Sequence, residues 1–286
     1  VWRIPENVKV EEAAGVSLVA LTAAQAIWYR LGLAAPFEYD RELVVKENPA
    51  WAEYQNAEAN GGSGQVNFFI YGASTAVGLY AAQMIRLSAE ASGKSVRLFG
   101  AASKARWPML KSEPYSYDHL VDYRDDDWPE QITKLANGGG MHYVYDCISE
   151  GTSVQRSLST LSPNGRAAIV RSREGGAWSA TAELPTEPIY GGVWEGLGEE
   201  VQYTGFTIKK SVAARHFAVE FYKWLSGVVG SKLMPVPIRS MPGGLERVVQ
   251  DGFQLLGAST MNPREAISRD EEWMKPVSAE KLVYQM

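Results

Sequence analysis

The sequence predicts an α/β fold in which helices cover both faces of a buried, doubly wound parallel sheet. From Gln65 onward, short apolar runs alternate with helical segments of roughly 10–15 residues, which is the pattern of successive βαβ units. Right-handed crossovers between such strands place helices on both faces of the sheet. The chain has 286 residues, of which 45% are apolar, and can therefore bury a sizeable core.

Charge and hydropathy exclude several classes of partner. The formal net charge is −5, the isoelectric point is about 5.4, and the basic residues form no block. A surface that binds nucleic acid or an anionic membrane is therefore not expected. The longest apolar runs are far shorter than a membrane-spanning helix, so we expect a soluble, cytoplasmic protein.

The chain holds few residues that could form a disulfide or a metal site. Cys147 is the only cysteine, so no intramolecular disulfide can form and folding does not depend on oxidation. The three histidines, His119, His142 and His216, show no i, i+4 pairing. A four-cysteine zinc site is excluded, and a catalytic zinc site of mixed Cys and His ligands is not expected.

The first 64 residues predict a helix followed by a surface excursion. Residues 10–33 carry a helical pattern, with Glu11 and Glu12 at its start and Gly32 at its end. Residues 35–64 are polar, are interrupted by Pro and Gly, and end in NGGSG. We expect them to form a surface excursion with some helix (KENPAWAEYQNA) rather than part of the core.

The expected sheet contains five short strands with helices between them. Apolar runs of this length, bounded by turn residues, are typical of strands buried on both faces. The strands are QVNFFIY, SVRLFG, HLVDY, HYVYDC and RAAIV, and helices near 75–88, 104–111, 128–136 and 152–161 follow the first four.

The remainder of the chain predicts one long helix and a return segment. Residues 212–229 form an amphipathic helix whose apolar stripe is more typical of a core face than of a binding surface. A helix near 245–256, a loop containing NPRE and a closing strand, KLVYQM, follow. We expect the edge of the sheet at residues 195–205. Their acidic, glycine-broken character discourages edge pairing, so a monomer is more expected than a dimer.

The stretch FFIYGASTAVGLYAAQ predicts a strand that runs through a tight turn into a helix. A dinucleotide loop needs such a turn, a helix N-terminus aimed at the pyrophosphate, and small residues where helix meets strand. Ala73, Thr75 and Gly78 occupy the glycine positions of the G-x-G-x-x-G fingerprint, so two of the three glycines are replaced. The hydroxyls of Ser74 and Thr75 either donate to phosphate or cap the helix. An ordinary strand–helix joint is the alternative.

The loop after the second strand bears on which cofactor such a turn would hold. An acid there binds the ribose 2′-hydroxyl of NAD, whereas a cation accommodates the 2′-phosphate of NADP. The sequence AASKAR contains no acid, and Ser103, Lys104 and Arg106 suit a phosphate by hydrogen bonding and charge. A helix cap on a solvated face is the alternative. Together the two loops favour NADPH in a Rossmann-type fold.

Several segments, taken in order, resemble the medium-chain dehydrogenase/reductase superfamily. Within it, the chain is most similar to the zinc-independent, fungal trans-acting enoyl reductases, the branch that includes the enoyl reductase of the lovastatin pathway. No single segment is specific, but their order and spacing together are, and they cover nearly the whole chain. The segments are IPENVKVEEAAGVSLVALTAAQAIWYRLGL, YGASTAVGLYAAQM, LFGAASKAR, LVDYRDDDW, YDCISEGTS, PGGLERVVQDGFQLL and KLVYQM.

The resemblance implies which residues hold the phosphates of the cofactor. Ser74, Thr75 and Val77 would lie on the pyrophosphate and nicotinamide side. Ser103 and Lys104 would hold the 2′-phosphate.

The resemblance also implies residues near the adenosine and the nicotinamide. Tyr123 would lie near the adenosine, and Cys147, Ile148 and Ser149 would line the nicotinamide end of the fourth strand. Thr22 matches a position whose hydroxyl often approaches the carboxamide. Each has a plainer alternative: Tyr123 as a core aromatic, Cys147 as a small buried apolar residue, and Thr22 as a satisfied helix hydroxyl. We assign Cys147 no catalytic role, because nothing basic lies near it in sequence.

The resemblance divides the chain into two parts. Residues 12–235 would form the NADP-binding Rossmann domain, with the surface insertion 35–64. Residues 1–11 and 236–286 would form a remnant of a GroES-like catalytic domain, which in this family precedes the nucleotide-binding domain. Either most of that domain lies outside this sequence, or the protein is naturally shortened. A shortened protein could bind NADPH and yet have lost its reductase chemistry.

The function implied is NADPH-dependent reduction of an α,β-unsaturated polyketide thioester, carried by a polyketide synthase, in fungal secondary metabolism. Thr75 is the catalytic candidate, as a hydroxyl near the reacting centre, and the sequence identifies no proton donor. Two alternatives stay open. One is a quinone or enone oxidoreductase that acts on a free small molecule, and the other is a non-redox protein that keeps the fold and binds NADPH.

Overall fold

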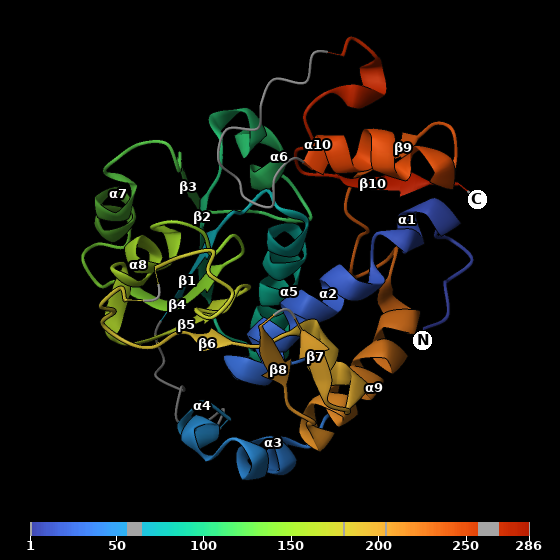
Figure 1. The fold of residues 1–286 in the computed structure, drawn as a ribbon. Helices are drawn as coiled ribbons and strands as arrows, with labels where there is room; N and C mark the ends of the chain where they lie inside the picture. The colour runs from blue at the N-terminus through green and yellow to red at the C-terminus, as the bar shows by residue number, and fades with distance from the viewer. Residues whose placement is uncertain (1, 56–64, 180, 204, 257–268, 286) are drawn as a thin grey trace.

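The computed structural model describes residues 2–55, 65–179, 181–203, 205–256 and 269–285. They form a parallel six-stranded sheet in the order β3-β2-β1-β4-β5-β6 (Figure 1). The predicted doubly wound parallel sheet is therefore confirmed, with one short strand more than expected. The strands are β1 (Val66–Tyr71), β2 (Val96–Ala101), β3 (His119–Val121), β4 (Met141–Asp146), β5 (Leu161–Ile169) and β6 (Ile189–Tyr190).

The helices connect these strands close to where the sequence predicts them. Those between the strands are α5 (Ala76–Ser92), η3 (Lys104–Arg106), α6 (Trp107–Lys111), α7 (Trp128–Leu135) and α8 (Ser153–Leu158). Before the sheet lie α1 (Val10–Ala14), α2 (Ser17–Ala24), the π-helix η1 (Gln25–Arg30), α3 (Arg41–Glu47), η2 (Pro49–Trp51) and α4 (Ala52–Gln55). After it lie η4 (Val193–Leu197) and α9 (Val212–Val228).

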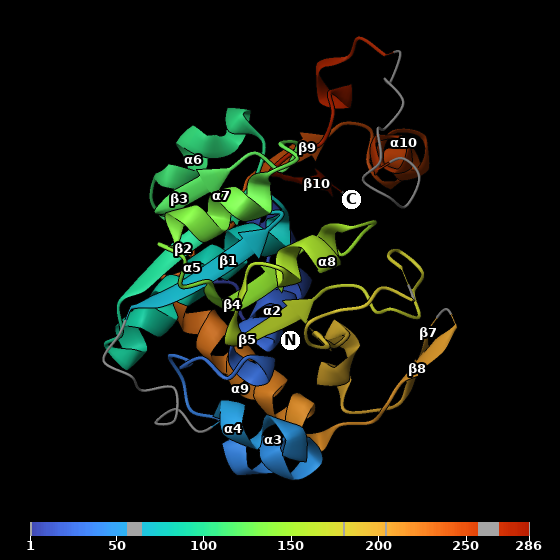
Figure 2. The ribbon, with the colours of Figure 1, turned by 90° about the vertical axis from the view of Figure 1, so that its left-hand side faces the viewer.

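The sheet is covered on both faces. Helices α7 and α8 lie on one face, and α2, α5 and α9 lie on the other (Figures 1 and 2). Alternate residues of the central strands point to the two layers, as the period of a strand requires. Phe69 and Val144 pack in the first layer, where the ring centroids of Phe69 and Trp128 are 5.4 Å apart. Phe68 and Tyr145 are buried in the second.

Residues 35–55 of the predicted surface excursion partly cover the core, which corrects that expectation, and residues 56–64 lie outside the described residues. Phe37 packs edge-on against Trp28, with ring centroids 5.5 Å apart, and Val44 is fully buried. The Glu47 carboxylate accepts a hydrogen bond of 2.6 Å from the Ser211 hydroxyl, just before α9 begins. The segment is mostly polar, so the sequence did not indicate that a few of its apolar residues pack against the aromatic stripe of α9.

The edge of the sheet also differs from the expectation. The strand next to β5 is β6, whereas segment 195–205 contributes part of η4 and the strand β7 (Val201–Tyr203). Strand β7 pairs with β8 (Phe206–Ile208) in a separate antiparallel hairpin. Gly198, at φ +73°, ends η4 in the left-handed region that glycine tolerates, so this segment turns where a continuous edge strand was expected.

The C-terminal return forms a second, small sheet. Strands β9 (Ile238–Met241) and β10 (Lys281–Tyr284) pair in parallel, which confirms the predicted closing strand. The predicted helix between them appears as η5 (Leu245–Arg247), the π-helix η6 (Val248–Phe253) and α10 (Gln254–Leu256), and η7 (Glu272–Met274) precedes β10. The predicted NPRE loop lies outside the described residues.

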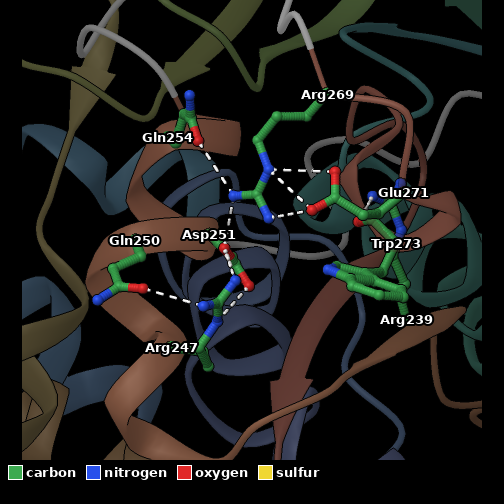
Figure 3. A network of polar contacts seen from close by, with 8 residues as sticks. All are labelled: Arg239, Arg247, Gln250, Asp251, Gln254, Arg269, Glu271 and Trp273. Carbon is green, nitrogen blue, oxygen red and sulfur yellow. Dashed lines mark hydrogen bonds and ion pairs between the residues drawn. The ribbon is translucent and has the colours of Figure 1, made fainter.

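A polar network holds the return together (Figure 3). Asp251 is fully buried and pairs with Arg247 at 2.9 Å and with Arg269 at 2.7 Å. Arg269 also pairs with Glu271 at 2.5 Å. Residues far apart in sequence are thus joined through one buried carboxylate.

Hydrogen bonds attach the return to the main sheet. The Gln83 side chain of α5 accepts from the Met234 amide at 2.7 Å and donates to the Met234 carbonyl at 3.1 Å. Arg106 donates from Nε to the Ser278 hydroxyl at 3.0 Å. Within the described residues, none of the helices combines the length and apolar character needed to cross a membrane.

Candidate functional site

The strand order creates a switch point between β1 and β4. These neighbouring strands end in register, with Tyr71 opposite Asp146, while β2 and β3 lie on one side and β5 and β6 on the other. The connections that follow β1 and β4 therefore diverge to opposite faces. Ligands of open α/β sheets bind at such a point, outside the carboxyl ends of the strands. The predicted turns 72–75 and 147–149 flank it.

The turn after β1 is tight and leaves little room for side chains. Gly72 has φ +77°, and a Cβ there would lie 2.8 Å from Cγ1 of Ile148. Gly78 lies in the first turn of α5, and a Cβ there would lie 2.5 Å from the Gly72 carbonyl oxygen. The Ala73 amide donates to the carbonyl of Ala101 on β2 at 3.0 Å. These contacts hold the turn close against the sheet, as a phosphate cradle requires.

The turn leads directly into the N-terminus of a long helix. Helix α5 has 17 residues, and Thr75 is its N-cap, with Oγ1 accepting from the Gly78 amide at 3.0 Å. Amides in the first turn of such a helix attract anions. The half-buried Ser74 hydroxyl has no side-chain hydrogen-bond partner within the described part of the chain, and Val77 is half-buried in the same turn. The backbone and hydroxyl donors present therefore fit a pyrophosphate.

The Thr75 hydroxyl makes more hydrogen bonds within the protein than the sequence indicated. Besides the bond from Gly78, its hydroxyl shares a hydrogen bond with the Cys147 thiol. The role that the structure shows is therefore a helix cap that also touches the end of β4. Direct participation of Thr75 in catalysis stays a prediction.

The loop after β2 presents a cation to solvent. Ser103 is half-buried immediately before η3, and Lys104 is exposed with no side-chain partner in the described ranges. The Lys104 amide donates to Oδ2 of Asp122 at 3.4 Å. Asp122 follows β3 directly and is 4% exposed, so a buried carboxylate fixes the backbone that carries Lys104.

Asp122 also fixes a second cation, which sequence reasoning missed. Arg124 donates to both of its carboxylate oxygens, at 2.9 and 2.8 Å, and these bonds lower the pKa of Asp122 to about 2. The Arg124 guanidinium also lies 5.5 Å from the centre of the Tyr123 ring. Tyr123 is 44% exposed and is therefore not the core aromatic of the plainer alternative. Arg106, considered for the phosphate, instead bonds Ser278.

The turn after β4 is built around Asp146, which sequence reasoning also missed. Its carboxylate accepts from the amides of Ile148 and Ser149 at 2.8 and 2.7 Å, and from the Ser153 hydroxyl at 2.6 Å. Ser149 has φ +53° and is fully buried. Its hydroxyl donates to the Asp146 carbonyl and accepts from the Val170 amide. The Ser149 side chain thus shapes the turn, and Ile148 is the member that reaches Gly72.

Cys147 is buried and the Thr22 hydroxyl is satisfied within its own helix, and their places beside a nicotinamide stay predictions. Cys147 is 7% exposed, and burial raises the pKa of its thiol well above the usual value, so the sulfur is a poor nucleophile. The Thr22 hydroxyl donates to the Leu18 carbonyl of its own helix at 2.9 Å.

Asp122 and Asp146, the two aspartates that sequence reasoning missed, share one signal in the sequence. Each is an acid at the carboxyl end of a predicted strand.

The described residues do not bring potential metal ligands together. In the ranges described, no group of three or more His, Cys, Asp or Glu side chains is placed to hold a metal ion. Independence from zinc stays a prediction from the sequence.

Comparisons with known proteins show which proteins the chain is similar to. Residues 76–189 match the family described as zinc-binding dehydrogenase. The trans-enoyl reductase xenG of Xenoacremonium sinensis is 24% identical over 99% of this chain and 65% of its own length. The trans-enoyl reductase ACTTS2 of Alternaria alternata is 27% identical over 53% of this chain and 35% of its own length. The chain thus spans about two thirds or less of these relatives.

Solved structures share the fold at low sequence identity. The CurK enoyl reductase superposes with a TM-score of 0.55 and 18% identity, over 86% of this chain and 59% of that one. A putative NADPH:quinone reductase from Bacillus thuringiensis gives a TM-score of 0.56 and 14% identity, over 90% of this chain and 63% of that one. Residues 76–189 thus match the zinc-binding dehydrogenase family, the fold is shared with solved enoyl reductases, and the resemblance to the fungal trans-enoyl reductases is confirmed.

Proposed function

We propose that this protein binds NADPH at the carboxyl edge of its sheet and is an enoyl reductase. The observation that carries the proposal is the pair of loops after β1 and β2. A glycine-tight turn leads into the N-terminus of α5, and the neighbouring loop carries the half-buried Ser103 and the exposed Lys104 and contains no acidic residue of its own. The first loop suits a pyrophosphate, and the second suits a 2′-phosphate rather than a bare ribose hydroxyl.

The residues of the chain bind and orient rather than react. A bound nicotinamide supplies hydride to the β-carbon of a double bond that is conjugated to a carbonyl. Ser74 and the first amides of α5 hold the pyrophosphate, and Tyr123 covers the adenosine. Ile148, Val77 and Thr22 border the nicotinamide side. We propose that the Thr75 hydroxyl, at the N-cap of α5, stabilises the reacting centre.

The substrate class rests on the relatives. The relatives compared above are named trans-enoyl reductases. The resemblance to that branch implies an α,β-unsaturated polyketide thioester, carried by a partner synthase, as the substrate. We propose that substrate and that partner for this chain, which we expect to act as a monomer. We also propose that residues 12–235 are the nucleotide-binding domain. The separate pairing of β9 and β10 supports assigning 236–286 to the catalytic domain, together with 1–11.

The test has two stages. The first measures the Kd of NADPH and of NADH by fluorescence titration, and we expect tighter binding of NADPH. The second follows NADPH oxidation with an α,β-unsaturated pantetheine thioester and, separately, with a free enone. Turnover of the thioester supports the proposal. No binding of either cofactor would overturn it.

A quinone or enone oxidoreductase is the second candidate, favoured by the fold shared with the quinone reductase. Faster turnover of the free enone than of the thioester would select it. Tight NADPH binding without turnover of either compound would instead identify a cofactor-binding protein without reductase activity.

A further inference from the structure

The loop after β3 is acidic and lies beside the loop that carries Lys104. Strands β2 and β3 are neighbours, and at their carboxyl ends the Ala102 amide donates to the Val121 carbonyl at 3.1 Å. Residues 122–127 read DYRDDD, with four acids and one cation, Arg124. Negative charge at this point would repel a 2′-phosphate, so the arrangement of these charges bears on the choice of cofactor.

One of the four acids differs from the others in what it contacts. The last three directly precede α7, and the Asp127 carboxylate accepts from Gln131 of that helix at 2.8 Å. Acidic side chains are favourable at a helix N-terminus. The Asp122 carboxylate instead accepts from the Lys104 amide at 3.4 Å. Asp122 is therefore the acid whose charge lies against the loop after β2.

Asp122 and Arg124 form an ion pair whose positive end faces solvent. Nε and Nη2 of Arg124 donate to the two carboxylate oxygens at 2.9 and 2.8 Å, which makes the pair bidentate. The Asp122 side chain is 5% exposed, whereas the Arg124 side chain is 59% exposed. A ligand that approaches Lys104 from solvent therefore meets the cation of the pair, because the anion lies beneath it.

We propose that Arg124 is a specificity-determining residue for the 2′-phosphate of NADPH. It neutralises the carboxylate that fixes the backbone of Lys104, and so prevents that carboxylate from offsetting the charge of the lysine. The inference rests on the proposed function, because it concerns the phosphate side of the same site. It adds a residue that lies outside the loop after β2.

The charge that Arg124 offsets is present at neutral pH. The hydrogen bonds from Arg124 lower the pKa of Asp122 to about 2. An ordinary aspartate also ionises well below neutral pH, so Asp122 stays charged when Arg124 is replaced. Substitution of Arg124 thus leaves an uncompensated carboxylate beside Lys104.

The experiment compares NADPH with NADH, which differ only in the 2′-phosphate. Their Kd values are measured by fluorescence titration at neutral pH and low ionic strength. The Tyr123 ring centre lies 5.5 Å from the Arg124 guanidinium, and any movement of this ring affects both cofactors and cancels in the ratio. We expect Arg124→Gln to reduce the preference for NADPH about fivefold, as one unit charge near a protein surface would. The reduction should shrink at high salt.

A double variant separates an effect of charge from an effect of structure. Asp122→Asn combined with Arg124→Gln removes both charges of the pair, and the asparagine keeps an oxygen that can accept from the Lys104 amide. We expect the double variant to recover most of the preference that Arg124→Gln loses. If Arg124 only clasped the loop, the double variant would recover none of it, because it lacks the clasp as well.

Arg215→Gln supplies the matched control. Arg215 is an exposed arginine of α9, and its substitution changes the net charge of the chain by the same amount as Arg124→Gln. It should leave the ratio of the two Kd values unchanged.

The outcomes separate this inference from the proposed function. A preference for NADPH that survives Arg124→Gln, or a double variant no better than Arg124→Gln, would overturn the role of Arg124 and leave cofactor binding intact. Equal binding of both cofactors by the wild-type chain would overturn the inference and the choice of NADPH. A wild-type chain that binds neither cofactor would overturn the inference and the proposed function together.

Discussion

At the scale of single residues, Lys104 is the side chain on which the choice of cofactor depends. It is exposed and, among the described residues, unpaired, so a 2′-phosphate would gain a charge-assisted hydrogen bond without displacing a protein partner. We expect Lys104→Ala to raise the Kd of NADPH about tenfold, the lower range for losing a charged hydrogen bond at a solvated site. The Kd of NADH should barely change.

Fluorescence titration of both cofactors checks this expectation. Lys134→Ala, at another exposed lysine on α7, is the control and should change neither Kd. Equal effects of Lys104→Ala on the Kd of NADPH and of NADH would contradict the proposed contact between Lys104 and the 2′-phosphate.

The candidate site could be predicted from sequence only as far as local patterns reach. Thr75 and Lys104 follow strands in a recognisable order, which is why both loops were found. Asp122 and Asp146 were not found because some of their partners are backbone amides, which carry no residue identity, and because the approach of the side-chain partners Arg124 and Ser153 is visible only in the fold. Ser149 was expected to line the nicotinamide end, yet its hydroxyl is committed to the backbone, a fact that only the fold reveals.

At the scale of elements, the joint between β1 and α5 depends on Gly78, the one glycine of the dinucleotide fingerprint that this sequence keeps. A Cβ at Gly78 would lie 2.5 Å from the Gly72 carbonyl oxygen, and backbone cannot yield as a flexible side chain does. We expect Gly78→Ala to destabilise the fold by about 1–3 kcal/mol through overpacking and to weaken NADPH binding. Urea unfolding and cofactor titration measure the two effects.

Gly227 offers the matched control. It lies in α9 without a positive φ, and a Cβ added there would meet no other atom within 4 Å. Gly227→Ala should therefore stabilise the fold by roughly 0.5–1 kcal/mol, because alanine loses less backbone entropy in a helix. If both substitutions had the same sign, close approach at Gly78 would not be the cause.

Helices and strands were predicted correctly where the local sequence pattern defines them. The predictions were wrong where the position of a segment depends on its packing against distant residues. The five strands and the helices between them have short apolar runs with clear turn residues, and the structure confirms them. The edge was misplaced because β6 has only two residues and carries no pattern of its own. Segment 35–55 was wrongly predicted to lie outside the core because just a few apolar residues in a polar stretch, among them Phe37 and Val44, pack against the core beside α9.

At the scale of the whole molecule, the small β9–β10 sheet is attached to the main sheet and its helices at several separate points. The return is attached before β9 by the paired hydrogen bonds of Gln83 with Met234, and after η7 by Arg106 with Ser278. Between these points the Val236 amide also donates to the Tyr80 hydroxyl at 3.3 Å, and the polar network around Asp251 holds the segment that follows β9. Arg106 belongs to the loop that also carries Lys104, so disorder in the return would reach the phosphate side of the site through one residue.

The network around Asp251 should therefore set the local stability of the return. Asp251→Ala leaves Arg247 and Arg269 without their shared carboxylate, and removing one member of a buried ion network disrupts the remainder. We expect faster amide exchange in 248–256 and 269–274, measured by mass spectrometry, with little change in β1.

Glu246→Ala, an exposed acid on the same helical segment, should leave exchange unchanged. Acceleration that stops near Met234 would show that the hydrogen bonds of Gln83 isolate the main sheet from the return. Equal acceleration in β1 and α5 would instead mean that the two sheets unfold as one unit. In that case the small sheet would be part of the stability of the nucleotide-binding fold rather than an appendage to it.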